Sequence, residues 1–303
     1  MKLKYMCQAV LALAICCFVM PLVAQDLEVR EPRDGDGVLK WKFTAGKKYK
    51  IVIDQNVDMQ MSAQGQKMNM TNIAINEMTL AVNEVNEDGS AKITTTIDRM
   101  KIDVDSPMMA MGFDSKDDDG GQSDPIASML RPIIGMDIPY SMSTSGKVSD
   151  VQIDENAFPD QGGQPVPGMM NAAALEEMVT KSSMEFPSEK LDVGHSWTEE
   201  QEMDMGGAKV HTVTEYTYRG VADVDGKPLH VIDADVKMDF PDGVQGMPVE
   251  ISDEDTLGRF FFDGNEGRLV KSTLEQFAVI SMAGGAVEQE LTQKTTSEFT
   301  EIE

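Results

Sequence analysis

Cysteine is scarce in this chain of 303 residues, and its three copies all lie close to the N-terminus. They are Cys7, Cys16 and Cys17, within a segment that we expect to be cleaved on export. A mature chain without cysteine cannot form disulfides, use a thiol as a nucleophile, or hold zinc or an iron–sulfur cluster through sulfur. Its stability must therefore come from a hydrophobic core, which favours a sizeable fold.

Histidine is equally rare, with three copies at His195, His211 and His230. Hydrolytic enzymes often need a base that titrates near neutral pH, and histidine is the usual one. These three show no HExxH or His-x-His pairing. The sequence also lacks the nucleophile elbow GxSxG and the phosphate-binding patterns GxGxxG and GxxxxGK[ST]. We therefore expect a protein that is not an enzyme and that uses no cofactor.

Basic residues are few, because 26 lysines and arginines stand against 52 aspartates and glutamates, for a formal net charge of −26. Such a chain repels phosphate backbones, which argues against nucleic-acid binding. Acidic clusters occur at Asp114–Asp124 and Asp253–Asp255, but neither has the spacing of an EF-hand. We interpret both as solvated loops, and the sequence leaves any metal site unknown.

The first 25 residues have the composition of a signal peptide. Lys2 and Lys4 give a positive start, residues 9–19 are apolar, and Pro21–Ala24 ends in a small residue. The apolar run is too short for a stop-transfer helix, so we expect no stable membrane span after cleavage. The sequence thus predicts an exported protein, periplasmic or extracellular, whose mature chain is two charges more negative than the full chain.

Alternating side chains predict where the fold begins. Within Tyr49–Met61, apolar residues alternate with polar ones, which is typical of a long antiparallel strand with one face in water. Residues 62–67 are the expected hairpin turn. On the return strand the apolar residues change phase at Ile73 and again at Met78. Such phase changes indicate a β-bulge or a strand that crosses between two packed faces.

The remaining pattern predicts more strands and a few helices. A short helix is expected at residues 125–134, and a longer one at Ala172–Phe186 with Asn171 as its N-cap. Further strands are expected at 91–104, 138–142, 147–153, 210–218, 232–240, 260–262, 269–274, 277–282 and 287–299, with a hairpin turn at 263–267. The predicted fold class is mainly β, with long antiparallel strands in two similar β-rich lobes and two or three short helices.

The two lobes are inferred from a recurring pattern. Phe43-x-x-Gly46-x-x-Tyr49 is matched by Leu191-x-x-Gly194-x-x-Trp197, and later turns match in the same order. This recurrence indicates duplication of a β-rich unit, as two domains or as two halves of one sheet system. The expected division is a signal peptide at 1–25, a flexible leader at 26–38, a first β-rich lobe at 39–156, a loop and helix linker at 157–187 and a second β-rich lobe at 188–303.

Several short motifs together resemble a known family. They are Trp41-Lys42-Phe43 with Gly46 and Tyr49, Asp88-Gly89, Phe113-Asp114-Ser115 and the run from Gly267 to Ser272. The chain resembles an uncharacterised family of secreted bacterial proteins, catalogued only as a domain of unknown function. That resemblance covers nearly the whole mature chain and implies no activity and no site residues. More loosely, long strands with a few short helices are similar to periplasmic lipoprotein-carrier folds, an analogy of architecture alone.

Methionine is abundant, with 24 copies, and several form Met-x-Met pairs on the apolar side of expected strands. Flexible thioether side chains fill irregular cores and line adaptable apolar grooves. The candidates for such a groove, covered by the helix at 172–186, are Met59, Met61, Met68, Met70, Met178, Met203 and Met205. The pattern favours a non-enzymatic envelope protein whose partner is an apolar small molecule or lipid.

Two alternatives to this function stay open. Thioether sulfur is a soft ligand that suits Cu(I), so the same methionines are consistent with a copper-binding protein. A structural or protein-interaction module is the other, and the sequence identifies no protein partner for it. Simple core packing also accounts for many of the methionines.

Overall fold

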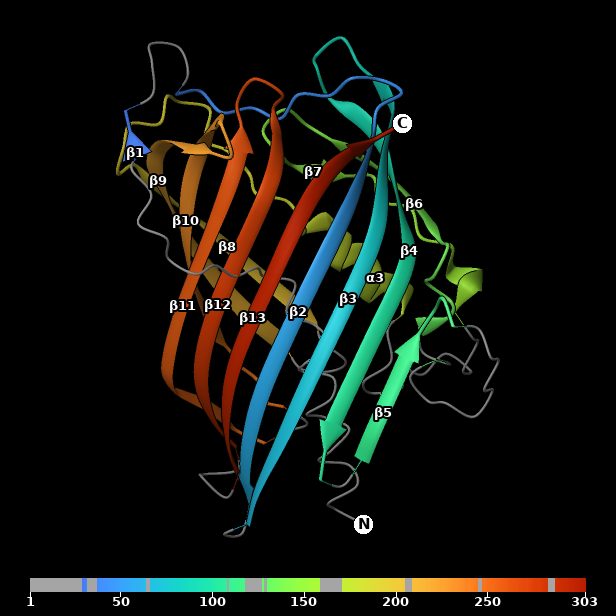
Figure 1. Cartoon of the computed structure of the whole chain (residues 1–303), viewed down its shortest axis with the longest axis vertical. Coiled ribbons are helices and arrows are strands. Elements are labelled where there is room, and N and C mark those ends of the chain that lie inside the picture. Colours follow the sequence, from blue (N-terminus) through green and yellow to red (C-terminus); the bar gives the residue numbers. More distant parts are fainter. Residues whose placement is uncertain are drawn as a thin grey trace.

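A computed structural model describes residues 29–31, 37–63, 66–107, 109–117, 127, 130–158, 171–204, 209–244, 247–282 and 287–303. In this part of the chain the strands form one antiparallel sheet (Figure 1). The strands are β1 (Val29–Arg30), β2 (Lys48–Ala63), β3 (Gln66–Val85), β4 (Ala91–Ser106), β5 (Met109–Asp114), β6 (Asp137–Met142), β7 (Val148–Ser149), β8 (Ser196–Asp204), β9 (Lys209–Val224), β10 (Lys227–Asp239), β11 (Val249–Asp263), β12 (Arg268–Met282) and β13 (Val287–Ile302).

The order of the strands places β13 beside β2 in the middle of the sheet. It runs β1-β9-β10-β11-β12-β13-β2-β3-β4-β6-β7, with β5 beside β4 and β8 beside β9. The last strand, β13, pairs with β12 on one side and with β2 on the other. The prediction of a mainly β, antiparallel protein is therefore confirmed. The division into two lobes is not confirmed, because strands from both halves of the sequence belong to one continuous sheet.

The recurring Gly motif nevertheless has the same backbone structure in both places. Gly46 has φ 85° and Gly194 has φ 87°, a region that favours glycine. Each glycine donates its N–H to the carbonyl of a neighbouring strand at 2.8 Å, Gly46 to Val82 and Gly194 to Tyr218. Each motif therefore positions the start of a long strand, β2 in one case and β8 in the other.

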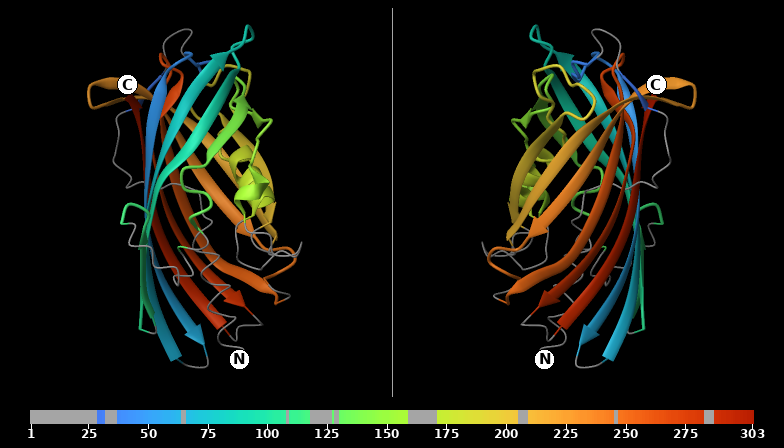
Figure 2. Two further views of the ribbon diagram at one scale, coloured as in Figure 1. Left: turned by 90° about the vertical axis from the view of Figure 1, so that its right-hand side faces the viewer. Right: turned by 90° about the vertical axis from the view of Figure 1, so that its left-hand side faces the viewer.

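The sheet is strongly curved, and its two ends approach each other (Figure 2). The helix α3 (Ala172–Thr180) contacts both β8 and β7, which lie toward opposite ends of the sheet. Asn171 caps this helix by accepting a hydrogen bond from the N–H of Ala174 at 2.9 Å, as predicted. The helix bridges the gap between the sheet ends and lies over the concave side.

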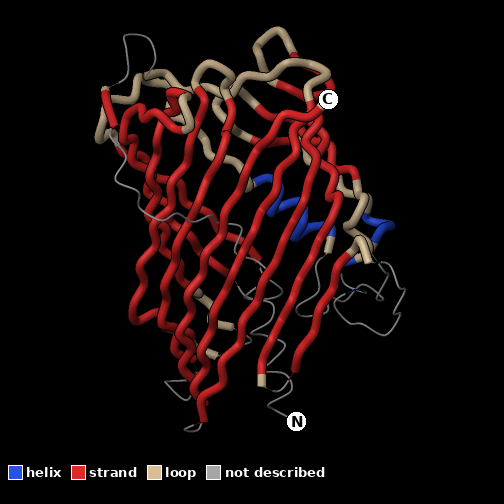
Figure 3. Tube along the Cα trace, in the orientation of Figure 1, coloured by secondary structure: helices blue, strands red, loops and turns tan. Residues whose placement is uncertain are grey.

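The number and length of the helices were overestimated from sequence. α3 ends at Thr180, although the apolar spacing predicted a helix to Phe186, because Lys181 already leaves helical geometry as the C-cap. In the described chain the only other helix with defined bounds is the 3₁₀ helix η1 (Glu155–Ala157), which was not predicted. Of the helix expected at 125–134, Ala127 and Leu130 are helical, residues 131–134 form turns, and the rest lies outside the described residues. Figure 3 shows how little of the fold is helical.

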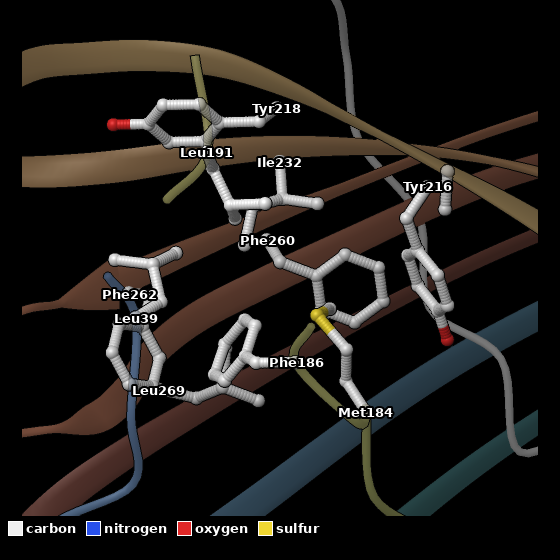
Figure 4. Packing of buried hydrophobic residues seen from close by; sticks show 11 residues of the cluster. Leu39, Met184, Phe186, Leu191, Tyr216, Tyr218, Ile232, Phe260, Phe262 and Leu269 are labelled. Carbon is white, nitrogen blue, oxygen red and sulfur yellow. The ribbon is translucent and has the colours of Figure 1, made fainter. Parts of the chain in front are cut away.

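An aromatic cluster closes one end of the curved sheet. It is built around Phe186, whose ring lies 4.8 Å from that of Phe262 and 6.1 Å from that of Trp41. Figure 4 shows Phe186 and Met184 beside Phe260 and Phe262, which both belong to β11. The buried members are Leu39, Met184, Phe186, Leu191, Tyr216, Tyr218, Ile232, Ala234, Phe260, Phe262 and Leu269.

A segment without regular structure holds this closed end together. We call residues 37–43 the strap. Within it, the N–H of Trp41 donates to the carbonyl of Thr144, and the N–H of Lys42 donates to that of Gly267, each at 2.9 Å. The indole N–H of Trp41 donates to the carbonyl of Met184 at 3.2 Å. The strap thereby links the β6–β7 connection, the segment after α3 and the β11–β12 turn.

The expected leader is partly structured. Val29 and Arg30, placed in the flexible leader at 26–38, form β1 and pair with Ala222 and Val221 of β9. Residues 26–28 and 32–36 of the leader, and the expected signal peptide at 1–25, lie outside the described residues.

Candidate functional site

The candidate site is the inner, concave face of the sheet. Side chains of alternate residues point to this face, and the register aligns them in rows across the strands. One row runs from Thr256 on β11 through Gln276, Gln293 and Val57 to Asn72 on β3. The inner face is therefore continuous across the boundary between the two halves of the sequence.

Four of the seven predicted methionines meet on this face. Met59 is the register partner of Met70, and Met61 is the partner of Met68. Met59 and Met61 are buried, with 3% and 9% of their surface exposed, and they pack with Val57, Val287 and Leu291. We call Met59, Met61, Met68 and Met70 the methionine cluster.

The other three candidates lie elsewhere. Met178 is half-buried on α3, and Met203 is half-buried on β8, where it pairs with Val210. Met205 lies outside the described residues. The methionine cluster is thus smaller than the set chosen from the sequence, and whether any of the seven binds a ligand stays a prediction.

Polar side chains are buried on the same inner face, in the middle of the sheet. The sequence patterns did not reveal them as a group. We call this group the polar belt: Asn72, Thr256, Gln276, Gln289, Gln293 and Ser297, each exposed by 6% or less.

Several atoms of the polar belt have no hydrogen-bond partner within the described part of the chain. Both amide atoms of Gln289 are unpaired in this sense, and so are Oδ1 of Asn72, Oγ1 of Thr256 and Oγ of Ser297. Burying a polar group without a partner costs about 1–3 kcal/mol in protein mutational data. A core made only for stability would carry apolar side chains at these positions.

Over the middle of their length, the four central strands carry no charge on the inner face. The inward residues are those at alternate positions of Ile51–Met61, Met68–Val82, Ser272–Met282 and Val287–Phe299, and none of them is Asp, Glu, Lys or Arg. Acidic side chains reach the inner face farther round the sheet, at Glu254 on β11 and Glu199 on β8. The centre of the face is therefore polar but uncharged.

Glu199 lies where β8 meets the segment after α3. Its carboxylate accepts a hydrogen bond from the N–H of Glu185 at 2.7 Å and is also hydrogen-bonded by the Tyr216 side chain. Burial raises the pKa of Glu199 to about 7. Burial likewise raises the pKa of Glu254, whose carboxylate accepts from the N–H of Met238 at 3.2 Å. Both acids thus resist carrying a negative charge.

The outer face carries the opposite arrangement, a cluster of paired ions. Glu77 accepts hydrogen bonds from Lys50 at 2.6 Å, Arg99 at 2.8 Å and Lys116 at 3.0 Å, and Arg99 also binds Asp114 through two nitrogens. These bonds hold the pKa of Glu77 at about 2. The cluster ties β2 to β5 together on the side away from the polar belt.

The histidines are dispersed in the structure. His230 is buried and its Nδ1 lies 2.8 Å from the Tyr218 hydroxyl, while His211 pairs with Asp239 and His195 with Glu189 near the surface. Among the described residues no group of three or more His, Cys, Asp or Glu is arranged to hold a metal ion. Asp118, Asp119 and Asp124 of the first acidic cluster lie outside those residues. Within the same coverage, no helix has the length and apolar character to cross a membrane.

No family model matches the sequence, and no curated protein matches it. Solved structures resemble it distantly. A lipovitellin structure on lipid–protein interactions has a TM-score of 0.48 and 8% identity, and the match covers 86% of this chain but only 26% of that one. An outer membrane channel from Pseudomonas putida F1 has a TM-score of 0.31 and 9% identity, with 90% and 100% covered.

A third neighbour is an exported protein with a YmcC-like fold from Bacteroides fragilis, at a TM-score of 0.28 and 9% identity, with 88% of this chain and 100% of that one covered. The hypothetical lipoprotein YmcC from Escherichia coli and a DUF1329 family protein from Desulfovibrio piger are also among the structures that this chain is similar to. At such scores the likeness carries no information on activity, so the function proposed next rests on the inner face.

Proposed function

We propose that this chain is an exported, non-enzymatic protein that binds an apolar or lipid-like ligand against its inner face. The observation that carries this proposal is the methionine cluster, in which two cross-strand pairs place four thioether side chains together. Unbranched thioether side chains adapt their shape to different apolar partners at low cost. The cluster therefore suits a ligand that is recognised by its apolar surface and not by one fixed geometry.

The curvature of the sheet supports the same function. The strands bend around the inner face, and α3 spans the two ends of the sheet as a cover (Figure 2). The aromatic cluster and the strap close one end, whereas the methionine cluster lies toward the hairpin tip of β2 and β3 at the other. A ligand held there is shielded from water along most of its length.

Co-purification tests this function. The exported protein is purified without detergent and extracted with organic solvent, and the extract is analysed by mass spectrometry. We expect a co-purifying apolar molecule whose amount falls several-fold in the double variant Met59→Ala and Met70→Ala. The matched control is Ile73→Ala, which removes an outward side chain of β3 that is 42% exposed. Repeated extracts without any apolar molecule contradict the proposal.

The same cluster supports one other candidate function, binding of Cu(I). Four thioether groups on two adjacent strands are soft ligands of the kind that Cu(I) prefers. Titration of the protein with Cu(I) against a competing chelator decides between the two. A competition curve that is unchanged by the protein eliminates copper binding and leaves the apolar ligand.

A further inference from the structure

We propose that the ligand is an uncharged amphiphile, whose tail lies against the methionine cluster while its hydroxyl, carbonyl or amide group is held by the polar belt. This inference rests on the proposed function and names the chemistry of its ligand. It follows from three observations: the position of the polar belt, the atoms it leaves unpaired, and the charge of the surrounding face.

The polar belt begins within the methionine cluster itself. Gln289 on β13 is the register partner of Met61 on β2 and of Ile280 on β12. Gln293 lies four residues further along the same strand, which is roughly 13 Å at the rise of an extended chain. A molecule lying along β13 therefore meets apolar and polar side chains in succession.

The unpaired atoms require a partner that both donates and accepts hydrogen bonds. Gln289 offers an acceptor oxygen and a donor nitrogen, neither of them bonded to another described residue. Asn72 and Ser297 add an acceptor oxygen and a hydroxyl within the same coverage. A hydroxyl or amide group of a ligand satisfies both kinds of atom, whereas a carboxylate or phosphate only accepts.

The charge of the inner face selects against ionic headgroups. The inward positions of β2, β3, β12 and β13 in the ranges given above carry no cation that would neutralise an anion. Burying an unpaired ion costs far more than burying a neutral polar group. The nearest inward acids, Glu199 and Glu254, already accept backbone hydrogen bonds, which leaves them poorly placed as partners for a cationic headgroup.

Displacement of a fluorescent dye tests this inference on the intact exported protein. The probe is N-phenyl-1-naphthylamine, an uncharged dye that brightens in apolar surroundings. Three competitors share one tail and differ in headgroup: decanol, decanoate and decyltrimethylammonium. We expect decanol to displace the dye at a concentration about tenfold lower than either ionic competitor, a difference of about 1.4 kcal/mol.

The variant Gln289→Leu tests whether the amide of Gln289 holds the headgroup. It removes the amide beside Met61 and keeps an apolar side chain of similar size, so we expect the dye to bind as before and the preference for decanol to fall several-fold. The control is Glu290→Leu, on the opposite face of the same strand, where residue 290 is exposed. This control should keep the full preference.

The possible failures are distinct. If the dye does not bind at all, both the proposed function and this inference are wrong. If the dye binds but decanoate or decyltrimethylammonium competes as well as decanol, the apolar site stands and the uncharged headgroup is wrong. If decanol is preferred equally by wild type and Gln289→Leu, the assignment of the headgroup to Gln289 is wrong.

Discussion

Gln289 of β13 lies directly opposite Met61 of β2, and neither atom of its side-chain amide has a partner among the residues that the structure describes. The chain thus keeps a costly polar group next to one of its most apolar surfaces. Local features that weaken a fold without a structural benefit are commonly found at functional sites. This relationship is the basis of the first prediction.

Replacing Gln289 by leucine should stabilise the ligand-free protein. The substitution removes a buried amide and adds apolar contacts beside Met61, so we expect the free energy of unfolding to rise by about 1–3 kcal/mol. Urea denaturation followed by circular dichroism measures the change. A loss of stability would show that the amide has a structural role.

Shortening Met59 should destabilise the fold, because its side chain is 3% exposed within the methionine cluster. We expect Met59→Ala to lower the free energy of unfolding by about 2–5 kcal/mol and Met59→Leu to change it by less than about 1.5 kcal/mol. The comparison separates loss of volume from loss of sulfur. Equal effects of the two substitutions would contradict close packing around Met59.

Glu199 should make stability depend on pH. Its pKa is about 7 in the folded chain against an ordinary value of 4.5, so between these values the folded state binds more protons than the unfolded state. The free energy of unfolding should therefore fall as the pH rises from about 4.5 to about 7. In Glu199→Gln this fall should shrink, as measured by denaturation near pH 5 and pH 8, whereas Glu200→Gln on the outer side of β8 should behave as wild type.

Glu77 should have the opposite pH dependence. Hydrogen bonds from Lys50, Arg99 and Lys116 hold its pKa at about 2, so its contribution to stability is complete above the ordinary value of 4.5 and is lost as the pH falls toward 2. We expect Glu77→Gln to cost about 2 kcal/mol at neutral pH. Denaturation curves at neutral and acidic pH check this, and a cost that persists unchanged at low pH would contradict it.

Because the strap lies against Gly267, replacing Gly267 by alanine should destabilise the fold more than replacing Gly46. A side chain at Gly267 would have its Cβ 2.5 Å from the backbone nitrogen of Lys42, whereas one at Gly46 would meet nothing within 4 Å. Both residues have positive φ, so Gly46→Ala should cost only about 1 kcal/mol of backbone strain. Gly267→Ala should cost clearly more in thermal denaturation, because the strap must move away. Similar melting temperatures would show that the strap adapts easily.

Much of the sheet was predictable because alternation is a local signal. The long strand at Tyr49–Met61 follows directly from it and is present within β2. The turn expected at 62–67 is too wide, because residues 62, 63, 66 and 67 belong to β2 and β3, while residues 64 and 65 lie outside the described residues. The phase change at Met78 has the same origin as the one at Ile73 and is not a bulge in β3: the register of β3 with β2 continues through Met78 without a break, and the extra residue at this level, Asp98, lies on β4. The bulge changes the apolar phase of β4, where Ile97 and Met100 on either side of Asp98 and Arg99 are buried in the same cluster.

The phase change at Ile73 was deceptive, and it conceals the polar belt. There the register with β2 continues without a bulge, so Asn72 points inward and is buried, while Ile73 points outward and is 42% exposed. Hydrophobic patterning assumes that apolar side chains face the core and polar ones face water. At Asn72 and Ile73 the arrangement is the opposite. A buried Gln or Asn on an otherwise apolar face is therefore recognised only once the register is known.

The joining of the two halves was equally inaccessible to local patterns. Pairing of β13 with β2 depends on contacts such as that between Lys47 and Glu301, which lie 254 positions apart. The recurring motifs indicated two units, but they contain no information on how the units share an edge. Only the complete strand register shows that strands from both halves of the sequence form one continuous inner face.

Placing the final strand at the centre has a consequence for biogenesis. Until β13 has been synthesised and has reached its place, β2 and β12 each retain an open edge and the methionine cluster lacks Val287 and Leu291. A chain synthesised from its N-terminus therefore cannot complete its central sheet before β13 is available, since such long-range pairing forms late and slowly.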